Sequence, residues 1–294
     1  MTWKGSLVRS QYRPHEQYDS KMLEAILLAI LQGLTEFLPI SSSAHLRIAG
    51  IISPGAEDPG ATFTAIIQLG TEFAVLVYFR RDIARIIKNW VASIQRKTHE
   101  AQQARLGWLI IFGSLPIMVF GFLLQDQIRE DFRSLWIIAT VLIVFGLVLG
   151  IADRYSRSSR NLDDMRMKDG LLVGLAQALA LIPGVSRSGA TIAMCRILGF
   201  SRVESLRYSF LLAIPAVLAS GFYELSQSVS QPELSKFSAL ETTVATLVAF
   251  VVGYLVIRWF LKFVSRASFA PFVIYRVLLG SVLLVLLGVG VISA

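Results

Sequence analysis

The chain is short of charge. Of its 294 residues only 16% are Asp, Glu, Lys or Arg, whereas a soluble domain carries about 25%. It has one cysteine, Cys195, so no disulfide can form within it. It also has no P-loop, dinucleotide-binding fingerprint, HExxH motif or Cys/His metal spacing, and no feature of nucleic-acid recognition. These deficits exclude an ordinary soluble domain and a zinc or nucleotide enzyme of a common type.

Hydrophobic residues are in excess instead. They make up 54% of the chain, mean hydropathy is +0.62, and they occur in long blocks. A helix that crosses a bilayer needs roughly 20 mostly apolar residues. The first 20 residues are polar, which predicts no cleavable signal peptide but a polar tail over residues 1–21. The six segments expected to span are Ala61–Phe79, Gly107–Leu124, Leu135–Ala152, Leu206–Tyr223, Thr243–Phe263 and Val273–Ile292.

Two further apolar stretches are each interrupted by a polar segment that follows a proline. We call Pro39–His45 the first elbow and Pro183–Thr191 the second elbow. Non-helical backbone at membrane depth persists only where protein buries it or water reaches it. Both stretches are therefore predicted to be re-entrant hairpins that meet inside the protein. Their apolar arms are Met22–Leu38 and Leu46–Ile52 around the first elbow, and Leu171–Ile182 and Ile192–Phe200 around the second.

The order of these segments predicts an internal repeat. Each half, about 22–152 and about 170–294, reads as one hairpin followed by three spans, so the second half must start on the opposite side of the membrane. The expected fold is an all-α polytopic membrane protein with six transmembrane helices and two re-entrant hairpins in an inverted-topology repeat, forming one integral membrane domain over residues 22–294. Loops 80–105, 153–168 and 258–276 contain seven, five and four Lys/Arg. The positive-inside rule puts these loops in the cytoplasm, so the first hairpin enters from outside.

Polar side chains gather at the first elbow. Gln32 and Glu36 are four residues apart and share one helix face, and Gln68 and Glu72 repeat that spacing within a predicted span. A carboxylate in an apolar segment needs a partner, a cation or water. These side chains therefore either have a functional role or form a structural hydrogen bond between the hairpins. Directly after Pro39 come hydroxyl and imidazole groups that could cap a helix or act in chemistry: Ser41, Ser42, Ser43 and His45.

The second elbow has the composition of an anion site. Arg187 lies among hydroxyl groups at the start of a predicted helix, where free backbone N–H groups favour phosphate. An arginine can grip a phosphate with two hydrogen bonds. The alternative is a salt bridge from Arg187 to Glu36 or Glu72. Two other cations near predicted span ends, Arg207 and Arg276, are expected to reach lipid headgroups.

Both elbows resemble the motifs of the undecaprenyl-diphosphate phosphatase family, also called the bacitracin-resistance protein family. The first motif is Gln32 through His45, QGLTEFLPISSSAH, and the second is Pro183 through Thr191, PGVSRSGAT. The stretches IIQLGTEFAVLVYF, FLLAIPAV and FAPFVIYR extend the resemblance over nearly all of the chain after residue 21. Two departures stand out: Gln32 replaces a second carboxylate, and Ala44 replaces a glycine, so the backbone at Ala44 is expected to have negative φ.

The resemblance implies an enzyme of the bacterial inner membrane that takes the terminal phosphate from the C55 isoprenoid diphosphate, giving the monophosphate carrier lipid for peptidoglycan synthesis. It implies an active site facing the extracytoplasmic side and a divalent cation, Mg²⁺ or Ca²⁺, held by Glu36 and Gln32. By the same resemblance Arg187 binds the diphosphate, and Ser42 is the nucleophile with His45 as proton shuttle. Ser41 is the nearest rival nucleophile, and direct attack by water activated by Glu36 or His45 stays open. The expected phosphate-binding residues are Arg187, Ser186, Ser188, Thr191 and Ser41, with Gln68 and Glu72 in support.

Two other classes of function fit parts of the sequence. A transporter or flippase of an anionic isoprenoid phosphate lipid would also use broken helices and an inverted repeat. It would not need the serine and histidine beside the anion site, which favours the enzyme. A purely structural scaffold leaves Arg187 and Glu36 unexplained. The expected partners are the lipid substrate and membrane lipids; a homodimer is an assembly that the sequence leaves open.

Overall fold

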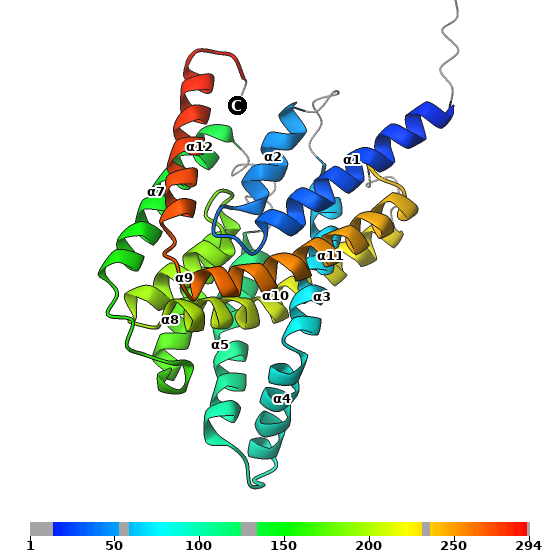
Figure 1. The fold of residues 1–294 in the computed structure, drawn as a ribbon. Coiled ribbons are helices and arrows are strands. Elements are labelled where there is room, and N and C mark those ends of the chain that lie inside the picture. Colours follow the sequence, from blue (N-terminus) through cyan, green and yellow to red (C-terminus); the bar gives the residue numbers. More distant parts are fainter. Residues whose placement is uncertain (1–13, 53–58, 125–133, 231–235, 293–294) are drawn as a thin grey trace, which may run out of the picture.

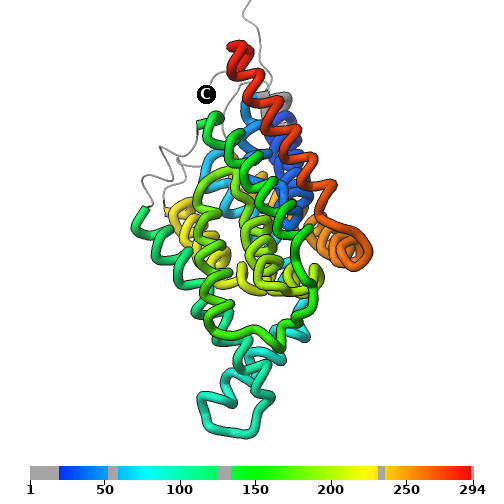
Figure 2. The backbone as a smooth tube through the Cα atoms, turned by 90° about the vertical axis from the view of Figure 1, so that its left-hand side faces the viewer, coloured from blue at the N-terminus to red at the C-terminus, as the bar shows by residue number. Residues whose placement is uncertain are grey.

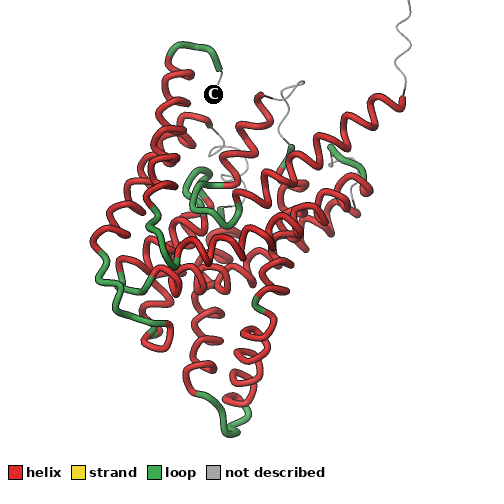
Figure 3. The backbone as a smooth tube through the Cα atoms, viewed as in Figure 1, coloured by secondary structure: helices red, strands yellow, loops and turns green. Residues whose placement is uncertain are grey.

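The computed structural model describes residues 14–52, 59–124, 134–230 and 236–292, and this part of the chain is almost entirely α-helical (Figure 1 and Figure 3). Within it no β-strand occurs, and one isolated β-bridge joins Arg160 and Phe200. Six of its helices are long and apolar enough to cross a membrane, as expected. They are α3 (Ala61–Tyr78), α5 (Ala101–Leu123), α7 (Leu135–Tyr155), α10 (Arg202–Ser230), α11 (Ala239–Val264) and α12 (Ala270–Gly288).

Two helices are longer than the apolar segments that predicted them. Helix α5 begins before the expected Gly107, and α10 starts and ends outside the expected Leu206–Tyr223, because a helix satisfies its own backbone in water as well as in lipid. The basic stretch expected to be a loop contains helix α4 (Arg80–Ile94). Ile83, Ile86 and Trp90 recur at helical spacing on the side that packs against α5, where Trp90 lies against Gly107, which explains a helix among so many cations.

Both elbows interrupt helices as predicted. Helix α1 (Pro14–Thr35) ends before the first elbow and α2 (Ser42–Ile52) begins within it. Helix α8 (Met167–Ala178) and a short 3-10 turn (Leu179–Leu181) lead to the second elbow, where α9 (Arg187–Ile197) begins. Helix α1 thus starts inside the stretch expected to be a polar tail, and residues 1–13 of that tail lie outside the described residues.

The two halves of the chain are interleaved. Helix α1 packs against α11 of the second half, and α8 packs against α5 of the first half (Figure 1 and Figure 2). Helix α3 packs on α10 and α11, and α7 packs along α12. The α5–α8 approach depends on glycine, since a Cβ added at Gly174 would lie 2.2 Å from the carbonyl oxygen of Gly113. A larger residue there would force the two helices apart.

The largest apolar core of the described residues includes side chains at the first elbow and holds that elbow in place. Phe37 is 1% exposed and packs edge-on against Phe210 of α10, with ring centroids 5.2 Å apart. Phe210 in turn packs against Phe79 at 6.3 Å. Each aromatic pair of this kind is worth about 0.5–1.5 kcal/mol beyond its buried area. Because Phe37 is anchored, its neighbour Glu36 is held between helices of both halves.

A buried cluster of charged side chains joins several helices at ends that do not form the elbows. Asp153 of α7 accepts hydrogen bonds from Arg196 Nε at 3.0 Å and from Arg202 Nε at 2.8 Å, and from the backbone N–H of Phe269 at 3.2 Å. Arg196 is 1% exposed. A charge this deep requires such a partner, so the cluster joins α7, α9 and α10 to the start of α12.

Candidate active site

Glu36 is the centre of the polar site. It lies in the turn between α1 and the first elbow, and its side chain is 4% exposed. Its Oε2 atom accepts a hydrogen bond from Gln32 Nε2 at 2.8 Å and another from Ser42 Oγ at 2.7 Å. Gln32 reaches it because the two residues are one helical turn apart, as the spacing predicted. Ser42 reaches it because the elbow reverses the chain.

The other carboxylate oxygen of Glu36 is held by residues distant in the sequence. Its Oε1 atom accepts from Gln68 Nε2 of α3 and from Arg187 Nη2 at the start of α9, each at 2.8 Å. Both oxygens are therefore acceptors only, which is the hydrogen-bonding pattern of an ionised carboxylate. The ion pair between Arg187 and Glu36, raised from the sequence as an alternative to a phosphate site, is present.

Unpartnered polar atoms lie around this centre. Glu72 is 1% exposed, and its Oε2 atom is 4.0 Å from Arg187 Nη2. Its Oε1 atom, Gln32 Oε1 and Arg187 Nε are all buried without a hydrogen-bond partner in the described part of the chain. Buried polar atoms are nearly always satisfied, so three unsatisfied ones in one place mark where water, a cation or phosphate oxygens would bind.

The local backbone explains how each elbow presents its side chains. Ser41 has φ 74° and Ser186 has φ 69°, and each directly precedes the first residue of a helix. Such a left-handed conformation is costly for a residue other than glycine. In return each serine hydroxyl accepts from the backbone N–H three residues later, at 3.4 Å from Ala44 and at 3.1 Å from Gly189. Ala44 itself lies within α2 with negative φ, as expected.

His45 is not bonded to the predicted nucleophile. Its Nδ1 atom lies 2.7 Å from the backbone oxygen of Ser41, which can only accept, so Nδ1 carries the proton. Its Nε2 atom lies 2.7 Å from the hydroxyl of Tyr275 in α12, and the two rings stack with centroids 5.6 Å apart. Tyr275 lies in the FAPFVIYR stretch but was not among the predicted site residues.

The remaining predicted phosphate-binding residues fall into two groups. Ser41, Ser186 and Ser188 form pairs within the elbows: Ser186 Oγ is 3.2 Å from Ser188 Oγ, and Ser41 Oγ is 3.1 Å from Ser43 Oγ. Thr191 is fully buried, and its hydroxyl contacts Ser209 at 2.6 Å and donates to backbone oxygens of α9. The structure thus brings together Gln32, Glu36, Ser42, Gln68, Glu72 and Arg187, and directs Thr191 elsewhere.

The prediction for Arg276 is wrong. Rather than reaching lipid headgroups, Arg276 is 0% exposed and donates hydrogen bonds to backbone oxygens of both elbows. A lone cation near the end of an apolar run is usually an interfacial residue, and only the packing of α12 against the elbows reveals the difference. Arg207 pairs with Asp82 at 3.1 Å and is about one third exposed.

The donor set suits a hard cation. Glu36, Glu72 and Gln32 supply oxygen atoms, which Mg²⁺ and Ca²⁺ prefer, and two of these oxygens are the unpartnered ones. Among the described residues no group of three or more His, Cys, Asp or Glu side chains gathers into a metal cluster. A cation at this site would therefore rely on the amide oxygen of Gln32 beside the carboxylates.

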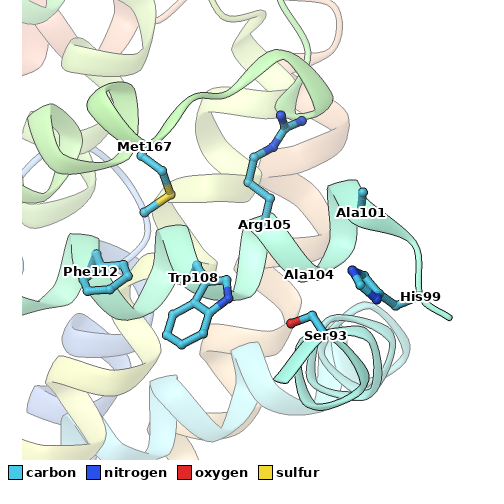
Figure 4. Close-up of a pocket in the computed structure, with 8 residues that line it drawn as sticks. All are labelled: Ser93, His99, Ala101, Ala104, Arg105, Trp108, Phe112 and Met167. Atoms are coloured by element: carbon cyan, nitrogen blue, oxygen red, sulfur yellow. The ribbon is translucent and has the colours of Figure 1, made fainter. Parts of the chain in front are cut away.

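A separate cavity of about 500 Å³ lies at the start of α5 (Figure 4). Trp108, Phe112 and Met167 form its apolar part, and Arg105 and His99 lie at its edge. It contains none of the predicted site residues. The chemistry-bearing groups are at the elbows instead.

Comparison with known proteins shows the kinship of the chain. The family described as bacitracin resistance protein BacA matches residues 25–282. A Micrococcus luteus protein called undecaprenyl-diphosphatase is 59% identical over 274 residues, which cover 92% of this chain and 99% of that protein. A Paenarthrobacter aurescens protein of the same name is 58% identical over 274 residues, with the same coverage. A third, undecaprenyl-diphosphatase 2 of Agrobacterium fabrum, is 55% identical over 273 residues, covering 92% of this chain and 98% of that protein.

Proposed function

The chain belongs to the bacitracin resistance protein BacA family, and we infer that it is an undecaprenyl-diphosphatase, a multi-pass membrane hydrolase that removes the terminal phosphate of a lipid diphosphate. The family favours this activity over a transporter of the same lipid. The observation that carries the site is the meeting of Ser42 and Arg187 on one carboxylate, Glu36, at 2.7 and 2.8 Å.

We propose the following roles for these residues. Arg187 exchanges part of its contact with Glu36 for the diphosphate and stabilises the charge on the transferring phosphoryl group. Ser42 Oγ attacks the terminal phosphorus while its proton passes to Glu36, and the bond from phosphorus to the bridging oxygen breaks, releasing the lipid monophosphate. Water then attacks the phosphoserine, the bond from phosphorus to Ser42 Oγ breaks, and Glu36 returns its proton to Ser42, while the oxygen and protons of water leave in inorganic phosphate. The contact between Ser42 and Glu36 favours Glu36 over His45 as the base.

His45 has a different role in this proposal. Its hydrogen bonds to the Ser41 backbone and the Tyr275 hydroxyl fix its ring and tautomer at the edge of the site, where it can exchange protons with departing phosphate. Ser41 as nucleophile, and direct attack by water on the phosphorus, are the rival routes. Ser186 and Ser188 would hold phosphate oxygens from the second elbow, next to the N-terminus of α9.

We also propose that Glu36, Gln32 and Glu72 hold a divalent cation. This is supported by the two buried, unpartnered oxygens and by the hardness of the donor set. A bound Mg²⁺ or Ca²⁺ would supply charge neutralisation on the phosphate oxygens. The surrounding protein residues shield the carboxylates from solvent and position them beside Arg187.

The arrangement of the two hairpins is part of the same proposal. Re-entrant hairpins related by an inverted repeat are supported by three parallels between the halves: the serine with positive φ, the hydroxyl pair two residues apart, and the hydroxyl that accepts from the N–H three residues later. The exchange of partners, α1 on α11 and α8 on α5, supports it further. The basic segments around α4 and after α7 favour an extracytoplasmic opening of the site.

The activity is tested by phosphate release. Purified protein in detergent, with C55 isoprenoid diphosphate and Mg²⁺ but no membrane gradient, should liberate inorganic phosphate with multiple turnovers. A transporter would release none under these conditions. The wild-type protein treated with a chelator is the matched control for the cation, and unchanged turnover after chelation would contradict the cation site.

A further inference from the structure

Arg276 bridges the two elbows. Its Nη1 atom donates to the backbone oxygens of Pro39 and Val185, both at 3.1 Å, and its Nη2 atom donates to that of Gly184 at 2.8 Å. Its Nε atom donates to the backbone oxygen of Leu142 in α7 at 3.1 Å. One side chain thus contacts the first elbow, the second elbow and a spanning helix.

These carbonyl groups need such a donor. The carbonyl groups of Pro39, Gly184 and Val185 lie where the chain leaves regular helix, so no intrahelical N–H reaches them, and leaving a buried carbonyl unpaired is costly. A guanidinium has five N–H donors in a rigid fork and can serve several acceptors at once, which the ammonium of a lysine cannot do with the same geometry. Arg276 therefore joins the backbones of the two elbows, in addition to the direct hydrogen bonds from Arg187 to Glu36 and from Ser188 Oγ to the backbone oxygen of Leu38 at 3.1 Å.

Glycines around Arg276 leave room for its side chain. A Cβ added at Gly189, in the second elbow, would lie 3.0 Å from Arg276 Nη1, and one added at Gly146 of α7 would lie 3.1 Å from Arg276 Cβ. Both distances are tighter than ordinary carbon contacts. Among the described residues no carboxylate lies within 4.0 Å of this guanidinium. Burying a cation without a counter-ion is costly, and here four backbone carbonyl oxygens accept its hydrogen bonds in place of a carboxylate.

We propose that Arg276 is a positioning residue that fixes the first elbow against the second and thereby holds Ser42 and Arg187 together at Glu36. Pro39 precedes Ser42 by three residues, and Val185 precedes Arg187 by two, so a shift of either backbone moves a group that contacts the carboxylate. The inference rests on the function proposed above. It assigns Arg276 no contact with the substrate.

The test compares Arg276→Met and Arg276→Lys with Arg207→Met. Arg207 is the matched control, because it is also a cation near a helix end but pairs with Asp82 away from the elbows. Two quantities are measured on folded, purified protein: the steady-state constants for phosphate release, and amide hydrogen exchange of the peptides that contain the two elbows. The exchange measurement needs no substrate.

Arg276→Met should lower kcat about 100-fold, because small displacements of reacting groups cost this much, while KM changes less than about threefold. Amide exchange should become faster in both elbows together. Arg276→Lys should recover about tenfold of the lost kcat, since its ammonium can still reach one or two of the carbonyls. Arg207→Met should leave both quantities as in the wild type.

Gly146→Ala keeps the charge and provides a second route if Arg276→Met does not fold. The added methyl group would lie in α7, outside both elbows, 3.1 Å from Arg276 Cβ and 3.6 Å from its Nε. It should displace this side chain and lower kcat in the same way, without removing any hydrogen-bonding group. Unchanged exchange in either elbow of Arg276→Met or Arg276→Lys, or a raised KM with normal kcat, would overturn the proposal. If the wild type released no phosphate, the proposed function would fail, while the exchange of the elbows would still decide whether Arg276 joins them.

Discussion

The two elbows have similar backbone geometry but carry different side chains. In each, a serine with positive φ ends the irregular segment, pairs with the hydroxyl two residues later, and caps the following helix. The next residue, the first of the helix, is Ser42 in one elbow and Arg187 in the other. Both donate to Glu36, one to each carboxylate oxygen. A common backbone thus places the proposed nucleophile and the proposed phosphate-binding cation at corresponding positions, both in contact with Glu36.

The arms that precede the elbows differ more. Glu36 lies five residues before Ser41, and the corresponding residue before Ser186 is Leu181. Gln32 has its counterpart in Gln177, which is 0% exposed and has no hydrogen-bond partner for either amide atom among the described residues. The acid is therefore on the first hairpin only. The comparison suggests that the first elbow carries bond-making chemistry and the second carries phosphate binding, which mutations can separate.

Removing the cation of the second elbow should have the largest effect. Arg187→Ala should lower phosphate release about 10⁴-fold, because an arginine on a transferring phosphoryl group is worth 10³–10⁵. Arg187→Lys should restore only part, since an ammonium lacks the planar fork. Activity is measured on C55 diphosphate in detergent, with thermal stability as a check of folding. Near-normal turnover of a folded Arg187→Ala protein would remove the phosphate-clamp role.

Removing the hydroxyl at the corresponding position of the first elbow should come next. Ser42→Ala should lower kcat about 10³-fold if Ser42 is the nucleophile. Ser41→Ala is the matched control, because it removes a neighbouring hydroxyl that lies 3.1 Å from Ser43 rather than on the carboxylate. A labelled phosphoenzyme trapped in wild type and lost in Ser42→Ala would confirm the assignment. A larger loss in Ser41→Ala would transfer the role to that residue.

Substituting each of the two buried glutamates should distinguish the central residue of the site from a supporting one. Glu36→Gln should lower kcat about 10²-fold, since the amide can neither take a proton nor attract the cation. Glu72→Gln should lower it only about tenfold, because Glu72 lies 4.0 Å from Arg187 and its Oε1 atom has no hydrogen-bond partner among the described residues. Titration of activity with Mg²⁺ reports the cation: its apparent affinity should fall most in Glu36→Gln. Equal losses would make both residues cation ligands.

The smallest effect is expected at the edge of the first elbow. Tyr275→Phe removes one hydrogen bond to His45 but keeps the stacked ring. A lost hydrogen bond of about 1 kcal/mol corresponds to about fivefold in kcat. The pH profile of kcat should shift with it, because Nε2 of His45 loses the hydroxyl group that donates to it in the neutral ring. A Tyr275→Phe protein with wild-type kcat and pH profile would show that Tyr275 only packs.

The sequence predicted the parts of this protein whose causes are local. Apolar runs of membrane length predicted six spans, and Pro39 and Pro183 beside polar residues predicted two interrupted helices. The spacing of Gln32 and Glu36 predicted that they share one helix face, where the structure shows a hydrogen bond between them. Helix α4 was missed because its charge hid its apolar face. Arg276 and Tyr275 were missed because neither belongs to a motif whose spacing indicates a contact.

Composition, hydropathy and short-range spacing by themselves determined that this is a helical membrane protein with an acid–hydroxyl segment and an arginine–hydroxyl segment. Only the tertiary structure decided that Arg187 reaches Glu36 across 151 positions of the chain, and that Arg276 joins both elbows. The physical reason is one of range. Helix formation and burial follow from neighbours within a few residues, whereas the contact between two elbows depends on how interleaved helices pack and on which carbonyl groups that packing leaves unpaired.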